Sequence, residues 1–234
     1  MNTIYTSGQY LESTRTWHSE DSPWKAAQIS KIINQNQIQL FQIAEIGCGA
    51  GAVLEELSKR DDFCRTQFKG YDISPQAIEL AKRREGTRVQ FTCEDLLSKN
   101  NTEHFDALLA IDVYEHVPDY MGFLTTCRMK ANYKIYHIPL DLHVSSVLRN
   151  AFINNRYTLG HLHYFTADSA IATLKDTGHE IVDYFYTSAA TELFWQHPSI
   201  KKALANVPRL ICSKLNLPFA ARIFGGYSLL VLAK

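Results

Sequence analysis

The stretch AEIGCGAGAVLEEL, residues 44–57, decides the fold. In it a short apolar run ends in three glycines at alternate positions, Gly47, Gly49 and Gly51, and residues with helical spacing follow at once. Glycines at such a junction let the backbone turn sharply and let a ligand approach the main chain without meeting a Cβ atom. The helix that opens there has N–H groups without intrahelical partners in its first turn. We therefore predict a strand, a ligand-binding loop and a helix, in that order.

Strands and helices alternate on both sides of this loop. Apolar runs with turn residues at their ends predict seven strands, over residues 41–47, 67–72, 88–93, 105–112, 132–139, 179–187 and, after a Gly-Gly turn, 225–234. Helical spacing is found between them, chiefly over residues 52–60, 75–84, 119–130 and 167–177. This alternation indicates βαβ units and a parallel sheet. Because the strands are mostly apolar, we expect helices on both faces of the sheet.

Acidic residues stand where two of the predicted strands end. Asp72 closes the second strand, and Glu94 and Asp95 follow the third. In nucleotide-binding α/β folds an acid at the position of Asp72 receives ribose hydroxyls, and ligands bind at the carboxyl ends of the strands. Two structural alternatives remain open: Asp72 could help to cap the helix that begins at Pro75, and the acid pair could form a solvated turn. The spacing G-x-G-x-G differs from the G-x-G-x-x-G of dinucleotide-binding loops, which argues against NAD.

These features together resemble a known family. The pattern E-x-G-C-G-x-G, the acid at Asp72 and the segment FDALLAIDVYEHVPDY (105–120) are similar to the class I S-adenosylmethionine-dependent methyltransferases. Within that class the chain resembles the branch of the ubiquinone-pathway methyltransferases and their small-molecule relatives, over residues 41–187 and the last strand. The resemblance implies a Rossmann-like α/β fold with a seven-stranded, mostly parallel sheet, an antiparallel last strand and helices on both faces.

The resemblance also implies S-adenosylmethionine as the cofactor and a set of residues that hold it. The methionine end would lie at the glycine loop and the sulfonium beside Ile111 and Asp112. Asp72 would bind the ribose, with Ile73 against the adenine. Asp95 would bind the adenine amine beside Leu96. The full set of expected cofactor-binding residues is Glu45, Gly47, Cys48, Gly49, Gly51, Asp72, Ile73, Glu94, Asp95, Leu96, Ile111 and Asp112.

Histidines are the candidate bases for the methyl acceptor. Histidine titrates near neutral pH and can remove a proton from the accepting group. We expect His116, in DVYEHV, or His163, in GHLHYFT (160–166), to act as the base, with Glu115 orienting one of them. Each histidine could instead be structural, hydrogen-bonded to a loop or packed beside a helix.

A metal-assisted reaction is the alternative. D-x-x-E-H resembles the E-x-x-E-H of metal-assisted O-methyltransferases, in which a later histidine completes the site. A divalent ion such as Mg²⁺ could then be held by Glu115, His116 and His163, and could acidify a hydroxyl pair. Asp112 replaces the first glutamate of that pattern with a shorter side chain, so we expect a site without a metal.

Composition narrows the partners. The chain has 24 basic and 24 acidic residues, a formal net charge of zero, and five scattered cysteines without a C-x-x-C pair. A nucleic-acid partner is therefore not expected, and neither is a disulfide framework. Neither a secretory signal nor a run of about 20 apolar residues is present. We expect a cytoplasmic enzyme that has no transmembrane segment and acts on a small molecule. The histidines on the acceptor side favour O-methylation over N- or C-methylation.

The chain divides into three expected parts. Residues 1–40 form an N-terminal arm and helix, residues 41–188 and 225–234 the methyltransferase core, and residues 189–224 a helical insertion. Tyr10, Trp17 and Trp24 could close over the cofactor or only pack against the sheet edge. The insertion alternates basic and apolar residues, so it could be a substrate lid, a solvated cover or a membrane-surface segment. Two other functions stay open: a module that binds S-adenosylmethionine without transferring its methyl group, and a membrane-surface methyltransferase of a lipid-linked substrate.

Overall fold

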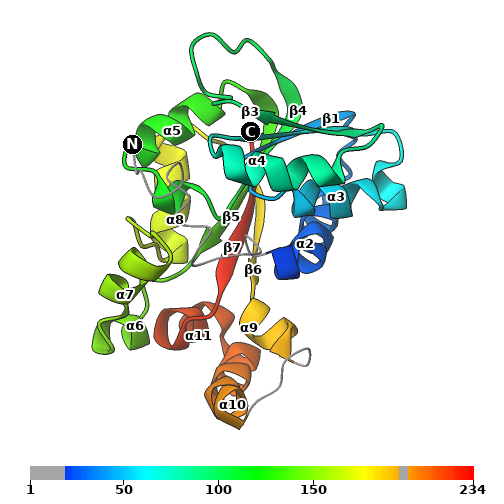
Figure 1. The fold of residues 1–234 in the computed structure, drawn as a ribbon. Coiled ribbons are helices and arrows are strands. Elements are labelled where there is room, and N and C mark those ends of the chain that lie inside the picture. Colours follow the sequence, from blue (N-terminus) through cyan, green and yellow to red (C-terminus); the bar gives the residue numbers. More distant parts are fainter. Residues whose placement is uncertain (1–18, 195–199) are drawn as a thin grey trace.

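A single seven-stranded sheet forms the centre of the molecule (Figure 1). The computed structural model describes residues 19–194 and 200–234. The strand order is β3-β2-β1-β4-β5-β7-β6. The strands are β1 (Gln42–Ile46), β2 (Gln67–Asp72), β3 (Val89–Cys93), β4 (Phe105–Ile111), β5 (Ala131–Pro139), β6 (Ile181–Thr187) and β7 (Ser228–Ala233).

The first five strands are parallel, and β7 is antiparallel to both of its neighbours, β5 and β6. The prediction of a mostly parallel, Rossmann-like sheet with an antiparallel last strand is therefore confirmed. The chain order reverses between β1 and β4, which lie side by side in the middle of the sheet. In open α/β sheets such a switch point opens a crevice at the carboxyl ends of the strands.

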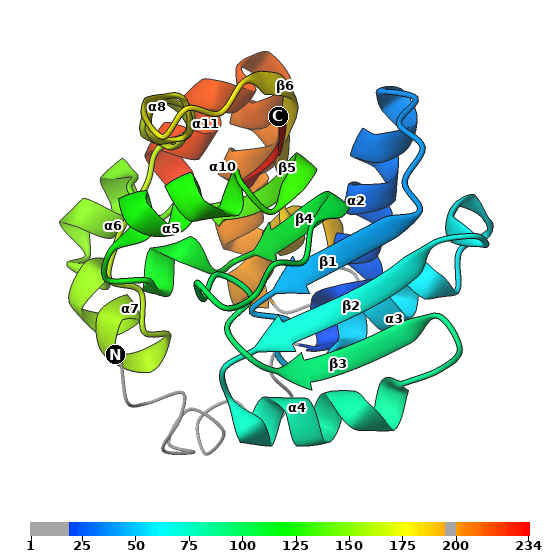
Figure 2. The same cartoon turned by 90° about the horizontal axis from the view of Figure 1, so that it is seen from above.

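Helices cover both faces of this sheet, as Figure 2 shows from above. One face packs against buried side chains of α2, α3 and α4, and the other against those of α5, α8 and α11. The helices are α2 (Ser22–Gln35), α3 (Ala52–Ser58), α4 (Pro75–Ala81), α5 (Tyr120–Cys127), α6 (Val144–Leu148), α7 (Ala151–Thr158), α8 (Ala167–Asp176), α9 (Ala189–Glu192), α10 (Ile200–Leu215) and α11 (Leu217–Phe224).

The segments outside the regular alternation have structure of their own. Residues 140–165, which follow β5, contain the two short helices α6 and α7, and residues 189–224 contain α9, α10 and α11. No helix of the described part is long and apolar enough to span a membrane. Tyr10 and Trp17 lie outside the described residues. Trp24 lies on α2, where its indole Nε1 donates to the Glu192 carboxylate at 2.8 Å, so that α2 and α9 are joined.

Candidate active site

A cavity of about 540 Å³ lies at the carboxyl ends of the central strands. Its walls come from the glycine loop after β1, the turn after β2, the segment after β4 and the start of α2. Residues from the segment after α7 complete it. The volume falls within the roughly 300–1,000 Å³ of small-molecule and cofactor sites. The cavity therefore occupies the crevice that the switch point of the sheet creates.

The glycine loop has a backbone that side chains would not tolerate. Gly51 has φ of +77° and stands at the N-cap of α3. A Cβ atom added to it would lie 2.4 Å from the ring of Phe91 on β3. Gly47 has φ of +67°, and there a Cβ atom would lie 2.8 Å from the Val113 side chain. The loop thus needs glycine both for its left-handed conformation and for close packing.

Asp72 holds the glycine loop to the end of β2. Its carboxylate accepts the Gly49 N–H at 2.9 Å and the Ser74 N–H at 2.8 Å. The cap of α4 is Ser74, whose hydroxyl accepts the Ala77 N–H. Burial raises the pKa of Asp72, against the lowering effect of its backbone hydrogen bonds. Asp72 thus lines the cavity, and its two backbone hydrogen bonds hold the glycine loop and the turn after β2 in place.

A second group of charges lies at the ends of β1 and β4. The Lys25 Nζ of α2 lies 2.7 Å from the Asp112 carboxylate, which also lies 2.6 Å from Nδ1 of His137 on β5. Burial would raise the pKa of Asp112, but His137 and Lys25 outweigh it and hold the pKa below its usual range. Nearby, Glu45 is 2% exposed, and its Oε2 has no hydrogen-bond partner among the described residues. Burial raises the pKa of Glu45 to about 8.

Nine of the twelve cofactor-binding residues expected from the sequence lie at or beside this cavity. Eight line it, and Gly51 supports it at the start of α3. The other three do not line it. Asp95 is exposed and accepts the Leu97 N–H at 2.9 Å in a turn, Glu94 is exposed, and Leu96 is fully buried in the core. The structure brings together the expected residues of the methionine and ribose ends and Ile73, and leaves the expected adenine contacts at the end of β3 outside.

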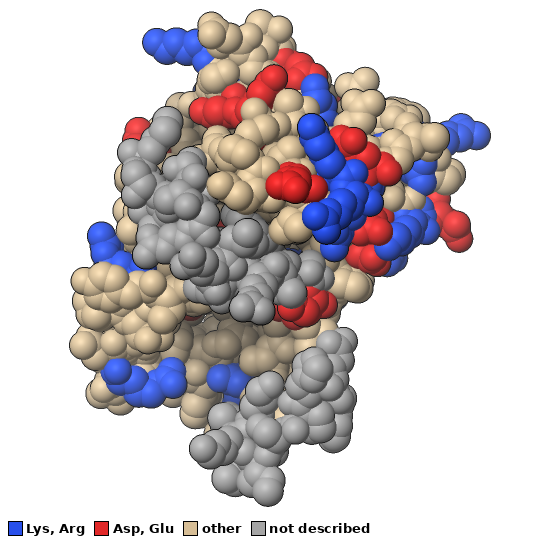
Figure 3. Space-filling view, in the orientation of Figure 1, with Lys and Arg blue, Asp and Glu red and all other residues tan. Residues whose placement is uncertain are grey.

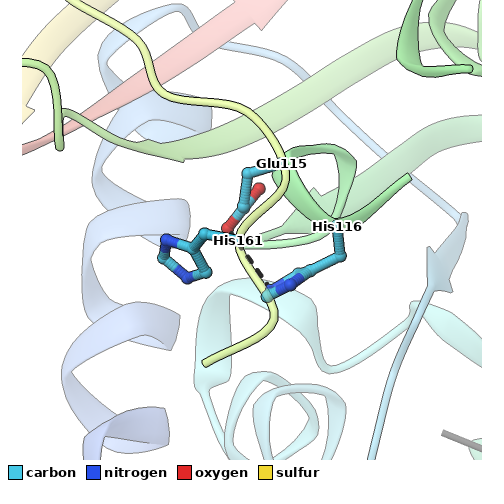
Figure 4. A group of neighbouring side chains, drawn as sticks. All are labelled: Glu115, His116 and His161. Carbon is cyan, nitrogen blue, oxygen red and sulfur yellow. Dashed lines mark ion pairs between the residues drawn. The ribbon is translucent and has the colours of Figure 1, made fainter. Parts of the chain in front are cut away.

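Glu115, His116 and His161 form the other wall (Figure 4). Nδ1 of His116 lies 3.1 Å from the Gly160 carbonyl, so that nitrogen carries the proton and Nε2 is the basic one. Nε2 of His116 lies 3.8 Å from Oε1 of Glu115. The backbone carbonyl of Glu115 accepts the N–H groups of Leu162 and His163, which draws the segment after α7 against this wall.

The Glu115 carboxyl has an unusual environment. The residue is 0% exposed, and neither of its oxygens has a hydrogen-bond partner among the described residues. Burial, and then the charge of Asp112, raise the pKa of Glu115 well above its usual range. Burial thus favours the neutral form of the Glu115 carboxyl, and a cation brought into the cavity would favour its ionised form.

His161 and His163 point to different surroundings. Nδ1 of His161 lies 2.6 Å from the Asp141 carboxylate, and the His161 ring lies edge-on to that of His116 at 4.8 Å between centroids. Nε2 of His163 instead lies 3.0 Å from the Val117 carbonyl, and its ring lies against Tyr120. His163 does not line the cavity. Within the described residues, the ligand atoms of Glu115, His116 and His161 all lie within 4.8 Å of one another, so His161 stands where the metal alternative expected His163.

Sequence reasoning did not find two residues of the site. Lys25 lies on the exposed-to-buried boundary of α2, and nothing in its sequence context distinguishes it from other helix lysines. His137 lies near the carboxyl end of β5, the neighbour of β4 in the sheet. A histidine at that end of a mostly apolar strand is a sequence signal that could have identified it as a site residue. Its Nε2 lies 2.9 Å from the Thr187 hydroxyl, and its ring meets Trp24 edge-on.

Comparison with known families agrees with this geometry. Residues 44–131 match the family described as "Methyltransferase domain". This match covers the glycine loop, Asp72 and the segment with Glu115 and His116. Together with the fold, it supports the class predicted from the sequence, the class I S-adenosylmethionine-dependent methyltransferases. The prediction made from the sequence is confirmed at this level, with S-adenosylmethionine as the cofactor of the class.

Several similar curated proteins are ubiquinone biosynthesis O-methyltransferases. The chain is 25% identical over 114 residues to the ubiquinone biosynthesis O-methyltransferase of Idiomarina loihiensis, a match that covers 46% of this chain and 45% of that protein. It is 35% identical over 93 residues to the enzyme of the same name from Methylocella silvestris, covering 37% and 34%. The matched part is thus less than half the length of these two relatives.

Solved structures share the fold at low identity. The magnesium protoporphyrin IX methyltransferase of Synechocystis has a TM-score of 0.60 at 14% identity, with 100% of this chain and 96% of that chain covered. The methyltransferase domain of bacterial CtHen1 has a TM-score of 0.58 at 15% identity, with 93% and 100% covered. The [4+2]-cyclase SpnF has a TM-score of 0.56 at 17% identity, with 88% and 80% covered. At these identities the likeness concerns the fold alone.

Proposed function

We propose that this chain transfers a methyl group from S-adenosylmethionine to a hydroxyl group of a small molecule, with His116 as the base. One observation carries the proposal. The wall with His116 faces the same cavity as the glycine loop and Asp72, so a cofactor site and a basic nitrogen share one space. The names of the similar curated proteins, ubiquinone biosynthesis O-methyltransferases, support an oxygen acceptor.

The residues at the methionine end fit the cofactor. The buried Glu45 carboxyl has an oxygen without a partner, and a cationic amine would satisfy it. The glycine loop offers a backbone that a ligand can approach closely. Asp72 lies at the position that receives ribose hydroxyls in nucleotide-binding sheets. When bound, S-adenosylmethionine supplies an activated methyl group on a sulfonium, so the protein only has to place the acceptor and take its proton.

His116 is arranged to take that proton. Its hydrogen bond to Gly160 fixes the tautomer in which Nε2 accepts. The ring is held over the buried Glu115 carboxyl and beside His161, which Asp141 orients in turn. A base held in one orientation removes a proton from an acceptor in the transition state without first having to rotate. We assign this cavity wall to the methyl acceptor. We propose that His161 orients the acceptor beside His116.

The test compares methyl transfer in variants of three histidines, His116, His161 and His163. Labelled methyl transfer from S-adenosylmethionine is measured with a panel of phenols, catechols and sugars, in the wild type and in the variants His116→Ala, His161→Ala and His163→Ala. We expect His116→Ala to lower turnover roughly 100-fold while cofactor binding, measured by calorimetry, stays unchanged. His163→Ala is the matched control and should keep most of its activity. Equal losses in His116→Ala and His163→Ala would contradict the assignment.

A metal-assisted variant of the reaction is a second candidate, because Glu115, His116 and His161 are grouped with ligand geometry. The hydrogen bond from His161 to Asp141 is of the kind that orients metal-bound histidines. Two imidazoles and one carboxylate suit zinc, iron or manganese better than Mg²⁺. Activity that disappears with EDTA and returns with one of these ions, and calorimetric binding of that ion lost in His161→Ala, would favour this candidate.

A module that binds S-adenosylmethionine without transfer is the remaining alternative. The fold also occurs in the [4+2]-cyclase SpnF, so architecture alone does not fix the reaction. The shared cavity with His116 favours an enzyme over such a module. Cofactor binding with S-adenosylhomocysteine product absent across the whole acceptor panel would instead favour the module.

A further inference from the structure

The end of the molecule that is formed by α6, α7, α10 and α11 has no acidic residues. We call residues 142–158 and 206–224 the lower pole, after their place in Figure 1. They contain no Asp or Glu, although the whole chain has as many acidic as basic residues. Hydrogen bonds connect its parts: the Ser145 hydroxyl donates to the Phe224 carbonyl, and Arg209 donates to the Gly225 carbonyl. The Ser145 bond joins the two segments of the lower pole, which carry basic residues and no acidic ones.

The lower pole also exposes large apolar side chains. Of the seventeen exposed large apolar residues in the described part, six lie in residues 142–157 and five in residues 207–219. The two most exposed of the pole are Leu215, at 83%, and Tyr157, at 82%. Single exposed apolar residues are ordinary, but such a concentration marks an interaction surface.

The spacing on α10 shows that these side chains form a stripe. Val207, Leu210, Ile211 and Leu215 follow positions i, i+3, i+4 and i+8 of a helix, and all four are exposed. A surface helix normally turns such a stripe toward the core. Here the stripe faces solvent, with Lys214 in the same row at i+7. The helix is built to place an apolar face against something outside the described chain.

Three basic side chains surround this apolar surface without acidic partners. Arg149, Arg156 and Lys214 are exposed, and none of them forms an ion pair within the described residues. Arg209 and Arg222 have other tasks: Arg209 holds the turn at Gly225, and Arg222 pairs with Asp168 at 2.5 Å. Over α6 and α7, Figure 3 shows blue atoms on an otherwise tan surface.

We infer that the lower pole binds an anionic lipid surface. Apolar side chains from two helix pairs, flanked by Lys and Arg, match the interface of a bilayer with negatively charged headgroups. A second copy of this chain fits less well. A two-fold interface pairs a surface with itself, and an acid-free basic surface repels its own copy.

The position of the pole relates this surface to the cavity. Leu159, the residue after α7, lines the cavity, and so does Ser228, four residues after the end of α11. A bilayer held at the lower pole would therefore lie beside the cavity wall that we assign to the acceptor. This extension rests on the proposed function: the acceptor would be an amphipathic molecule, with its apolar tail in the bilayer and its hydroxyl group at His116.

Vesicle co-sedimentation tests the surface without any need for activity. Phosphatidylcholine vesicles are compared with vesicles that also contain phosphatidylglycerol. We expect binding that depends on phosphatidylglycerol and falls about tenfold or more in the apolar variant Ile211→Gln/Leu215→Gln and in the basic variant Arg149→Gln/Lys214→Gln. The matched controls, Val182→Gln/Tyr184→Gln and Lys82→Gln/Arg83→Gln, change exposed residues elsewhere and should bind like the wild type.

Three outcomes would overturn the inference. These are no binding to vesicles with phosphatidylglycerol, binding equally strong in pole variants and controls, or a concentration-dependent dimer that Ile211→Gln/Leu215→Gln abolishes. Far-ultraviolet circular dichroism confirms that each variant is folded. Calorimetry with S-adenosylmethionine in the absence of vesicles keeps the two proposals apart, because lipid binding and cofactor binding can then fail independently.

Discussion

The Lys25 ammonium group lies 2.7 Å from the Asp112 carboxylate and joins α2 to the end of β4 at the floor of the cavity. The two side chains are only 14% and 28% exposed. Burial would lower the pKa of Lys25, but the charge and hydrogen bond of Asp112, together with the charges of Asp21 and Glu45, outweigh burial and raise that pKa. Both groups are therefore charged at neutral pH, and α2 is held against the sheet by a largely buried ion pair.

Removing one partner of this pair should be costly. Lys25→Ala leaves Asp112 with one cation fewer beside the buried Glu45, so we expect a loss of about 2–4 kcal/mol in the free energy of unfolding. Urea denaturation measures it. Lys59→Ala is the control, because Lys59 pairs with Glu55 and Glu56 on the surface, where such pairs contribute about 0–1 kcal/mol. Equal losses in the two variants would show that the Lys25 pair is no more than a surface contact.

Substitutions of Asp72 and Asp95 test two parts of the expected cofactor site, the ribose end and the adenine end. Asp72→Ala should weaken S-adenosylmethionine at least tenfold, or about 1.4 kcal/mol, from the loss of charge-assisted hydrogen bonds. Asp95→Ala should have a smaller effect, since the Asp95 side chain is exposed and lies outside the cavity lining. Titration calorimetry with both variants checks this. A larger loss in Asp95→Ala would mean that the adenine end reaches past the cavity walls to the end of β3.

Asp72→Ala also removes acceptors from Gly49 and Ser74, so a loss of affinity could arise from a distorted loop. Asp72→Asn keeps one oxygen acceptor, so it removes the charge and only one of these two backbone hydrogen bonds. Weakened binding in Asp72→Asn with an unchanged melting temperature would assign the effect to the ligand.

The sequence predicted the sheet because local signals and fold agree there. The glycines after β1 have left-handed backbone, and the apolar runs predicted as strands form one sheet in which β1 to β5 are parallel and β7 is antiparallel. Asp72 is the last residue of β2, so its position at the cavity could be predicted from the sequence. Because strand geometry is regular, a site residue at the end of a predicted strand can be placed at the edge of the sheet from the sequence.

Side chains on irregular segments could not be placed in this way. His161 and His163 are two residues apart in a segment without helix or strand, and only His161 faces the cavity. Which of them does so depends on hydrogen bonds from the backbone of this segment to the Glu115 carbonyl. Lys25 meets Asp112 through tertiary packing of α2, across 87 residues of sequence. No periodicity encodes such contacts.

Gly51 should tolerate no side chain. Gly51→Ala puts a Cβ atom into left-handed backbone, at a cost of about 1–2 kcal/mol, and against the Phe91 ring, which adds strain. We expect a loss of about 2 kcal/mol or more in stability by urea denaturation. Gly86→Ala is the control, since an added Cβ meets nothing within 4 Å there. A Gly51→Ala protein as stable as Gly86→Ala would show that the loop relaxes freely.

Glu45 should make stability depend on pH in a defined direction. Its pKa is about 8 in the folded protein and 4.5 in its usual state, so between these values the folded protein holds a proton that the unfolded chain has lost. The stability that this proton brings is fully present below about pH 4.5 and is lost as the pH rises through 8. Glu45→Gln stays neutral throughout. The variant should therefore gain stability relative to the wild type between pH 6 and about pH 8.5 in urea denaturation. A constant difference across that range would place the Glu45 pKa near its usual value.

The same proton should respond to the cofactor. A cation placed beside Glu45 favours its ionised form, so binding of S-adenosylmethionine near pH 7 should release up to one proton. Calorimetry in two buffers with different ionisation enthalpies measures this release. Glu45→Gln, which has no proton to lose, should release none from this site. S-adenosylhomocysteine retains the amine but lacks the sulfonium charge, so it shows which of the two cations acts on Glu45. Equal release with both ligands would place the amine there, and release with S-adenosylmethionine alone would place the sulfonium there. No release from the wild type with either ligand would remove the methionine end from Glu45.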